Sequence, residues 1–318
     1  MKKLFAILFL CSVIVSMLFA SGAQEATEAE FAYPTKQVEI LVPANPGGNT
    51  DAVPRLYQKY LEKLWGVPVV LTNAKGATAQ FCIDTYGAEP DGYTLVTNTD
   101  SPFIERVMGG IPFEIEDLTI IGIWAEFPGP ILVVNSKSGW NTLDDFVQAC
   151  NAKPDTLTIA TNYTGNTRIM AEMLKKAGIN FRIVDSDGGS DRQAKILGGH
   201  VDAVLLSWAE CKDYIASGEL VALCCVDSER CETYPDIPTA IELGYDCVYP
   251  TRHFLSTTPG VDERIVKVWE DALTQISNDP EFQKEMWETA GAHAVFRNRE
   301  ESMAKFNSLI PLFKEFFE

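Results

Sequence analysis

The chain has 318 residues, and 46% of them are hydrophobic, which is enough for packed cores and excludes an intrinsically disordered protein. The formal net charge of −18 at pH 7 argues against nucleic acid or an anionic membrane surface as a partner. A small anionic ligand stays compatible with this charge, because a pocket responds to its own dipoles and basic groups.

The N-terminus has the pattern of a secretory signal peptide. Lys2 and Lys3 precede an apolar run from Leu4 to Ala20, and small residues follow up to Ala23. A membrane anchor is the alternative, but this apolar run is short for a membrane-spanning helix. We therefore expect residues 1–23 to be a cleaved signal peptide, with cleavage after Ala20 or Ala23, and the mature protein to be periplasmic.

The first part of the mature chain alternates strand-like and helix-like segments. Strands are predicted at Val38–Pro43, Val67–Thr72 and Tyr93–Thr97. Helices are predicted at Asp51–Trp65, with Asn49 or Thr50 as its N-cap, and at Ala77–Ala88. This βαβαβ order indicates a parallel sheet with helices on its faces. Ligands of such sheets bind beyond the carboxyl ends of the strands, which is where the Gly47–Thr50 turn lies.

A second block repeats this pattern. Strands are predicted at residues 131–135, 156–161, 181–185, 201–206 and 219–226, and helices at residues 142–151, 168–177 and 191–197. The polar segment Asn162–Thr167 precedes the helix at 168–177, so each block has one strand, polar turn and helix of the same kind. Because a helix N-terminus favours negative charge, two such turns predict two anion-receptive sites facing one cleft.

The chain then returns to the first block near Val248–Ser256. Helices are predicted at Asp262–Ser277, Pro280–Ala290 and Arg299–Phe317. The last helix carries an apolar stripe that indicates core packing, formed by Phe306, Leu309, Leu312, Phe313 and Phe316. We expect lobe 1 at residues 31–125, lobe 2 at 126–248 and the return to lobe 1 at 249–318.

Seven cysteines remain after the signal peptide: Cys82, Cys150, Cys211, Cys224, Cys225, Cys231 and Cys247. An odd number leaves at least one thiol free or paired between chains. A Cys231–Cys247 disulfide is one pairing open to an exported protein. The spacings contain no Cys-x-x-Cys pair, so we expect no metal site.

Three motifs in the first hundred residues point to a family. They are Asn-Pro-Gly-Gly-Asn-Thr-Asp ending at Asp51, Asn-Ala-Lys-Gly-Ala-Thr from Asn73, and Pro-Asp-Gly-Tyr-Thr-Leu from Pro90. In this order they resemble the extracytoplasmic solute receptors of the tripartite tricarboxylate transporter family, also called Bug-type receptors. Leu197–Ala203 and Tyr234–Gly244 extend the resemblance, which covers the chain from about residue 33 to its end.

The resemblance implies an α/β architecture, the type II periplasmic-binding-protein fold, with a ligand cleft between its two α/β lobes. It also implies a monomeric receptor without a cofactor, which delivers its ligand to membrane permease subunits. Family members hold a ligand carboxylate through backbone amides and waters in two facing turns. The ligand-binding residues implied here are Ala44, Asn45, Gly47, Gly48, Asn49, Thr50, Asp51, Asn98, Thr99, Asp100, Ser101, Thr161, Asn162, Gly165, Asn166, Thr167, Arg168 and Asp187.

The chain departs from the family pattern after the strand at 181–185. Where the family has a Pro-Tyr-Lys-Gly-like stretch, Asp185–Ser190 reads Asp-Ser-Asp-Gly-Gly-Ser. Asp187 there, and Asp100 in the first block, would suit an ammonium group or sugar hydroxyls. The ligand is therefore expected to be a small organic anion or an amino-acid-like zwitterion.

Some residues of the first block have a second interpretation. Gly47 and Gly48 serve either ligand contact or only a tight turn. Asp51 either contacts the ligand or caps the following helix and complements its dipole.

Four residues further along the chain are open in the same way. Arg168 is either a carboxylate clamp or a solvated helix charge. Arg252 and His253 lie close enough to the second crossover to reach the cleft. Trp208 fits packing better than stacking on a ligand.

Two other function classes are alternatives to a transport receptor. An enzyme is not expected, because the chain has only three histidines and neither a His-Glu-x-x-His motif nor a Gly-x-Ser-x-Gly elbow. A binding protein that signals to a membrane sensor needs the same cleft as a transport receptor, and this alternative stays open.

Overall fold

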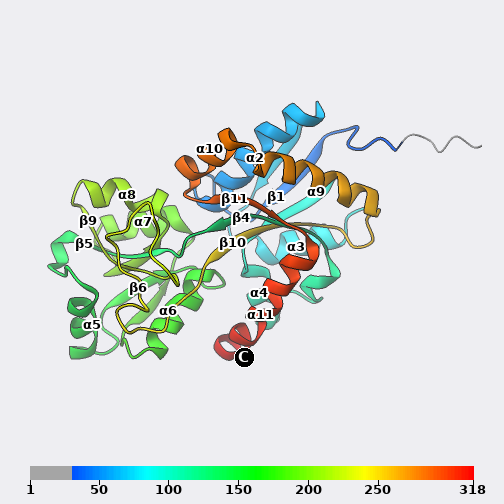
Figure 1. The fold of residues 1–318 in the computed structure, drawn as a ribbon. Coiled ribbons are helices and arrows are strands. Elements are labelled where there is room, and N and C mark those ends of the chain that lie inside the picture. Colours follow the sequence, from blue (N-terminus) through cyan, green and yellow to red (C-terminus); the bar gives the residue numbers. More distant parts are fainter. Residues whose placement is uncertain (1–30) are drawn as a thin grey trace, which may run out of the picture. The chain divides into compact units, whose positions relative to one another are not determined.

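The computed structural model describes residues 31–318, of which residues 36–318 form one compact unit (Figure 1). The predicted signal peptide lies outside the described residues. Within the described part, no helix combines the length and the hydropathy that crossing a membrane would require.

Within the described residues, the first sheet has six strands in the order β11-β4-β10-β3-β1-β2. Its parallel half contains β1 (Val38–Val42), β2 (Val69–Asn73) and β3 (Thr94–Asn98), with β1 paired to both neighbours. Its antiparallel half contains β4 (Thr119–Phe127), β10 (Thr251–Thr257) and β11 (His293–Arg297). The predicted βαβαβ order is thus confirmed, and β10 and β11 from the later part of the chain also pair in this sheet.

Within residues 31–318, six helices lie in the same two parts of the chain as the strands of this sheet. They are α2 (Asn49–Trp65), α3 (Thr78–Tyr86), α4 (Ser101–Val107), α9 (Glu263–Ser277), α10 (Pro280–Ala290) and α11 (Arg299–Phe317). Tyr57 of α2 ties one of them to the sheet, because its ring stacks on Trp124 and its hydroxyl donates to the Trp124 carbonyl over 2.7 Å. Phe306 and Phe313 of α11 are buried, and the other residues of its apolar stripe pack against the same core, as predicted.

In the described part of the chain, the second sheet has five strands in the order β7-β6-β8-β5-β9. The strands are β5 (Ile131–Asn135), β6 (Thr158–Thr161), β7 (Arg182–Asp185), β8 (Ala203–Leu206) and β9 (Leu220–Cys225). The helices are α5 (Leu143–Ala152), α6 (Asn166–Lys176), α7 (Gly189–Leu197) and α8 (Trp208–Ala216). Short 3₁₀ turns lie at η1 (Ile115–Asp117) and η2 (Ser136–Ser138).

Two segments connect the sheets and are bonded to each other. The Gly129 N–H donates to the Asp227 carboxylate over 2.7 Å, and the Val226 N–H donates to the Pro130 carbonyl over 2.9 Å. A Cβ at Gly129 would lie 2.0 Å from the Val226 carbonyl oxygen, so only glycine permits this approach. The division of the chain into lobes at residues 125 and 248 remains a prediction.

Several predicted details were wrong. The N-cap of α2 is Gly48, so Asn49 and Thr50 already lie inside the helix. The helices α6 and α7 each begin two residues earlier than predicted, because Gly165 and Gly188 are their N-caps.

Four elements were not predicted, namely β4, β11, α4 and α8. The Cys231–Cys247 disulfide is not formed, and all seven cysteines of residues 31–318 are free thiols. The Cys247 thiol is instead buried beside the Met170 carbonyl.

Candidate functional site

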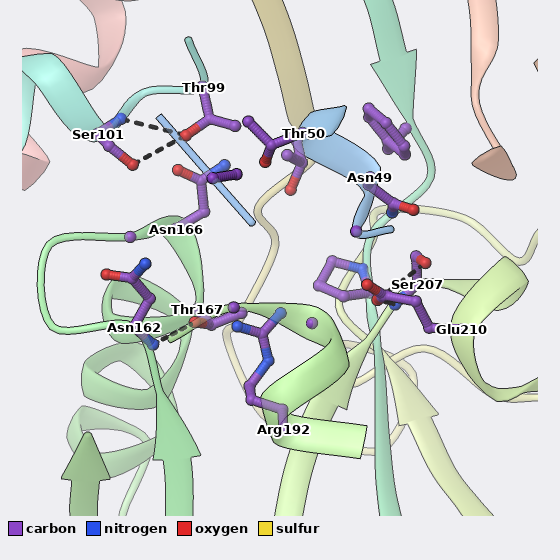
Figure 2. A pocket seen from close by; sticks show the side chains of 18 of the residues that line it. Asn49, Thr50, Thr99, Ser101, Asn162, Asn166, Thr167, Arg192, Ser207 and Glu210 are labelled. Carbon is purple, nitrogen blue, oxygen red and sulfur yellow. Dashed lines mark hydrogen bonds between the residues drawn. The ribbon is translucent and has the colours of Figure 1, made fainter. Parts of the chain in front are cut away.

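A cavity of about 160 Å³ lies where turns from both sheets meet (Figure 2). The first sheet contributes the turn between β1 and α2 and the turn between β3 and α4. The second sheet contributes the turn between β6 and α6, the turn before α7 and the start of α8. Most of these turns follow the carboxyl end of a strand, which is where open α/β sheets bind ligands.

The first turn presents the N-terminus of α2 to this cavity. Gly48 is the N-cap with φ −95° and ψ 172°, and its carbonyl accepts from the N–H groups of Asp51 and Ala52. The N–H groups of Asn49 and Thr50 precede these and therefore have no acceptor within the helix. The side chains of Asn49 and Thr50 line the cavity. This turn therefore offers an anion both backbone N–H donors and the positive end of the α2 dipole.

Asp51 holds this turn in place from outside the cavity wall. Its carboxylate accepts from Gly47 N–H at 2.9 Å, Arg55 Nε at 2.7 Å and Asn73 Nδ2 at 2.9 Å. Burial raises the pKa of Asp51, but the hydrogen bonds from Arg55, Gly47 and Asn73 outweigh it and lower the pKa below its usual value. The carboxylate therefore stays charged and fixes the position of the Gly47–Gly48 backbone.

The second turn presents the N-terminus of α6 in the same way. Gly165 is its N-cap with φ −102° and ψ 167°, nearly the conformation of Gly48. The Asn162 N–H donates to Thr167 Oγ1 over 3.2 Å and shapes the turn. A Cβ at Gly165 would lie 2.8 Å from Asn162 Cβ, whereas a Cβ at Gly48 would meet nothing within 4 Å. Two matched helix N-termini therefore face one cavity.

The turn after β3 adds uncharged polar groups. Thr99 Oγ1 and Ser101 Oγ form a 2.9 Å hydrogen bond at the cavity wall (Figure 2). Asp100 between them is fully buried and points away, accepting from the Tyr249 hydroxyl over 2.8 Å. Burial raises the pKa of Asp100, although the Arg252 charge and the Tyr249 hydrogen bond act against this.

The structure brings thirteen of the predicted ligand-binding residues to the wall: Ala44, Asn45, Gly48, Asn49, Thr50, Asn98, Thr99, Ser101, Asn162, Gly165, Asn166, Thr167 and Asp187. Five others lie outside it: Gly47, Asp51, Asp100, Thr161 and Arg168. Ligand contact by any of them stays a prediction.

Residues left open by the sequence are also placed. Arg168 pairs with Glu172 over 2.7 Å and lies over the Tyr163 ring. Trp208 packs against Tyr234, with ring centroids 4.7 Å apart. His253 does line the cavity, and its burial lowers the imidazole pKa to about 3, so the ring is neutral at pH 7.

Sequence reasoning missed the contribution of α7 and α8. Arg192 and Glu210 line the cavity and, with Asp187, are the arginine and carboxylate side chains of its wall within the described residues. Asp187 is neutralised by Lys75 of the turn after β2, over 2.5 Å. Ser207 and Glu210 form the capping box of α8. A serine followed three residues later by a glutamate is a sequence pattern that would have predicted a helix start here.

Metal binding has no support in the described residues. No group of three or more His, Cys, Asp or Glu side chains in residues 31–318 is arranged to hold a metal ion.

Comparison with known proteins gives a consistent result. Residues 53–308 match the family model described as tripartite tricarboxylate transporter family receptor. The chain is 29% identical to Protein BugT of Bordetella pertussis over 261 residues, covering 80% of each chain.

Solved structures agree in fold. The periplasmic binding protein BugD superposes with a TM-score of 0.80 at 24% identity, over 90% of this chain and 97% of that one. MatC from Rhodopseudomonas palustris, solved with bound malate, superposes with a TM-score of 0.80 at 21% identity, over 90% of this chain and all of that one. The predicted periplasmic-binding-protein fold with two α/β lobes is thereby confirmed.

Proposed function

Because the chain belongs to the tripartite tricarboxylate transporter receptor family, we propose that this solute receptor binds a small organic carboxylate in the cavity and delivers it to the family's membrane permease. One observation carries the proposal, namely the matched N-termini of α2 and α6 at one cavity. Free backbone N–H groups at a helix start suit a carboxylate oxygen without needing a side-chain cation.

The two turns belong to different sheets, which gives binding a mechanical consequence. A carboxylate bonded to both turns would hold the two sheets together. The paired connections near Gly129 and Val226 are the places where a hinge motion would occur, as in other hinged binding proteins. A ligand-stabilised closed form is what a permease would recognise.

Further parts of the proposal follow from the family. The mature chain would be exported, act in the periplasm as a monomer and bind without turning its ligand over. MatC is similar to this chain and was solved with malate, which supports a carboxylate as the ligand class. Transport is favoured over signalling to a sensor, since the matching family is one of transporter receptors.

Calorimetric titration of the mature protein tests the ligand class. The panel holds di- and tricarboxylates, amino acids, aromatic acids and neutral sugars. We expect at least one carboxylate-containing compound to bind with micromolar or tighter affinity, on the order of −8 kcal/mol, and sugars not to bind. Binding of a sugar with no binding of any carboxylate would contradict the proposal.

A further inference from the structure

One buried cation enters the cavity. Arg192 is only 9% exposed, and its Nε donates to the Leu205 carbonyl over 2.9 Å, which fixes the plane of the guanidinium. No described residue accepts a hydrogen bond from either Nη of Arg192, and Figure 2 shows the guanidinium directed into the cavity. The edge of the guanidinium formed by its two Nη atoms can donate two parallel hydrogen bonds, which is a geometry in which arginine binds a carboxylate.

The carboxylates nearest to Arg192 do not pair with it. Asp191 is occupied by the Ser186 hydroxyl, the Asp187 N–H and Lys195. Burial lowers the pKa of Arg192, and the charges of Glu210 and Asp191 offset this only from a distance. Because a buried charge without a bonded partner is costly, an anion that reaches Arg192 gains more than it would at a solvated arginine.

Glu210 supplies the opposite charge on the same wall. Its Oε2 accepts from the N–H and the hydroxyl of Ser207, at 2.9 and 3.0 Å. Its Oε1 accepts no hydrogen bond from any described residue, and lies so close to Gly189 that a Cβ there would be 1.7 Å away. Glu210 is therefore held rigidly with one oxygen available, and a carboxylate oxygen takes a donor such as an ammonium group.

We propose, on the basis of the carboxylate receptor inferred above, that Arg192 and Glu210 make it selective for zwitterions, with Arg192 binding a ligand carboxylate and Glu210 the neighbouring ammonium. The ligand class is then an amino acid with both groups on one carbon. The backbone N–H groups at the N-termini of α2 and α6 then bond to the lone pairs of this carboxylate that Arg192 leaves free. A plain dicarboxylate would leave Glu210 without a cation and place two like charges on one wall.

Ligands matched in carbon skeleton test the proposal on the whole mature protein. Aspartate, malate and succinate differ only in an ammonium, a hydroxyl or a hydrogen on one carbon, and alanine, lactate and propionate form a shorter set. In at least one set, the amino acid should bind at least ~10-fold more tightly than both analogues, a difference of about 1.4 kcal/mol.

Two substitutions assign the roles. Glu210→Gln keeps an acceptor for Ser207 and should abolish the preference for the amino acid. Asp213→Asn removes a charge from an exposed position on the same helix and should leave the preference unchanged. Arg192→Gln should weaken every carboxylate at least ~10-fold, with partial recovery in Arg192→Lys.

The outcomes separate the two proposals. If malate or succinate binds the wild-type protein as tightly as aspartate, and no amino acid is preferred, the zwitterion proposal is wrong and the carboxylate receptor stands. If no carboxylate of any kind binds, both fail. Thermal unfolding shows whether each variant is folded. If Glu210→Gln is not folded, the affinity of the wild-type protein for the amino acid relative to its analogues decides the zwitterion proposal by itself.

Discussion

The two halves of the cavity wall present different kinds of groups to a ligand. In the half built on the first sheet, the nearby carboxylates Asp51 and Asp100 are buried and face away from the cavity, which leaves backbone donors and neutral polar groups. In the half built on the second sheet, Arg192 and Glu210 enter the cavity with their charges. The difference suggests that the first half recognises any carboxylate, while the second half selects among them.

A large effect on both folding stability and ligand affinity is expected from Asp51, the carboxylate that shapes the first half of the cavity wall. Asp51→Asn keeps the volume but removes the charge that binds Gly47 N–H and Arg55. Because the side chain is buried, we expect unfolding free energy to fall by about 2 kcal/mol and affinity at least ~10-fold. Urea unfolding and calorimetry measure both, and a loss no larger than that of Asp213→Asn would mean that Asp51 does not hold the turn.

The two N-cap glycines should respond with opposite signs to the same change. Serine at Gly48 has open space and can cap α2, so Gly48→Ser should stabilise the protein by roughly a few tenths of a kcal/mol. Serine at Gly165 meets Asn162 Cβ, so Gly165→Ser should destabilise by about 1–3 kcal/mol. Equal shifts in the unfolding temperatures of the two variants would contradict this prediction, because they would show that a side chain at Gly165 does not clash with Asn162.

The half of the cavity wall built on the first sheet is uncharged only while the His253 imidazole is neutral. Burial holds its folded pKa at about 3, below the usual 6.5, so the unfolded chain binds the extra proton between these values. Folding stability should therefore fall as the pH falls below 6.5, by about 1 kcal/mol between pH 7 and 5.5 from this group. His253→Gln should remove that part of the pH dependence, and an unchanged slope would rule out a buried neutral histidine.

The smallest expected effect concerns the ion pair that joins the halves. Lys75 and Asp187 come from different sheets and are both partly exposed, so Lys75→Gln should weaken ligand binding only about two- to fivefold. Asp187→Asn should give a similar loss, and the double variant no more than either. Additive losses would show that the two side chains act separately.

Much of this architecture could be read from the sequence, for reasons that also explain the gaps. The strands at 38–42, 69–73 and 94–98 alternate with helical segments, so periodicity and the Gly47–Gly48 turn located the first half. Strand β4 was missed because nearly all of its residues are buried, which removes the polar–apolar alternation that marks a strand.

The half of the cavity wall built on the second sheet was harder to predict for a different reason. An arginine within a polar helix, such as Arg192 in α7, has the sequence pattern of a surface residue. Only the tertiary packing of α7 against β8 shows that it is buried and enters the cavity. The prediction that Asp100 and Asp187 supply a negative site also depended on side-chain direction, and the structure shows Asp100 bonded to Tyr249 and Asp187 paired with Lys75.

The most direct test of the central claim, that backbone donors at the α2 N-terminus bind a ligand carboxylate, is a pair of substitutions at Gly48. Gly48→Asp and Gly48→Asn both place a good N-cap in open space and differ only in charge. Calorimetric titration with the tightest wild-type ligand should give binding at least ~100-fold weaker for the aspartate variant than for the asparagine variant. Equal affinities in the two folded variants would contradict the account.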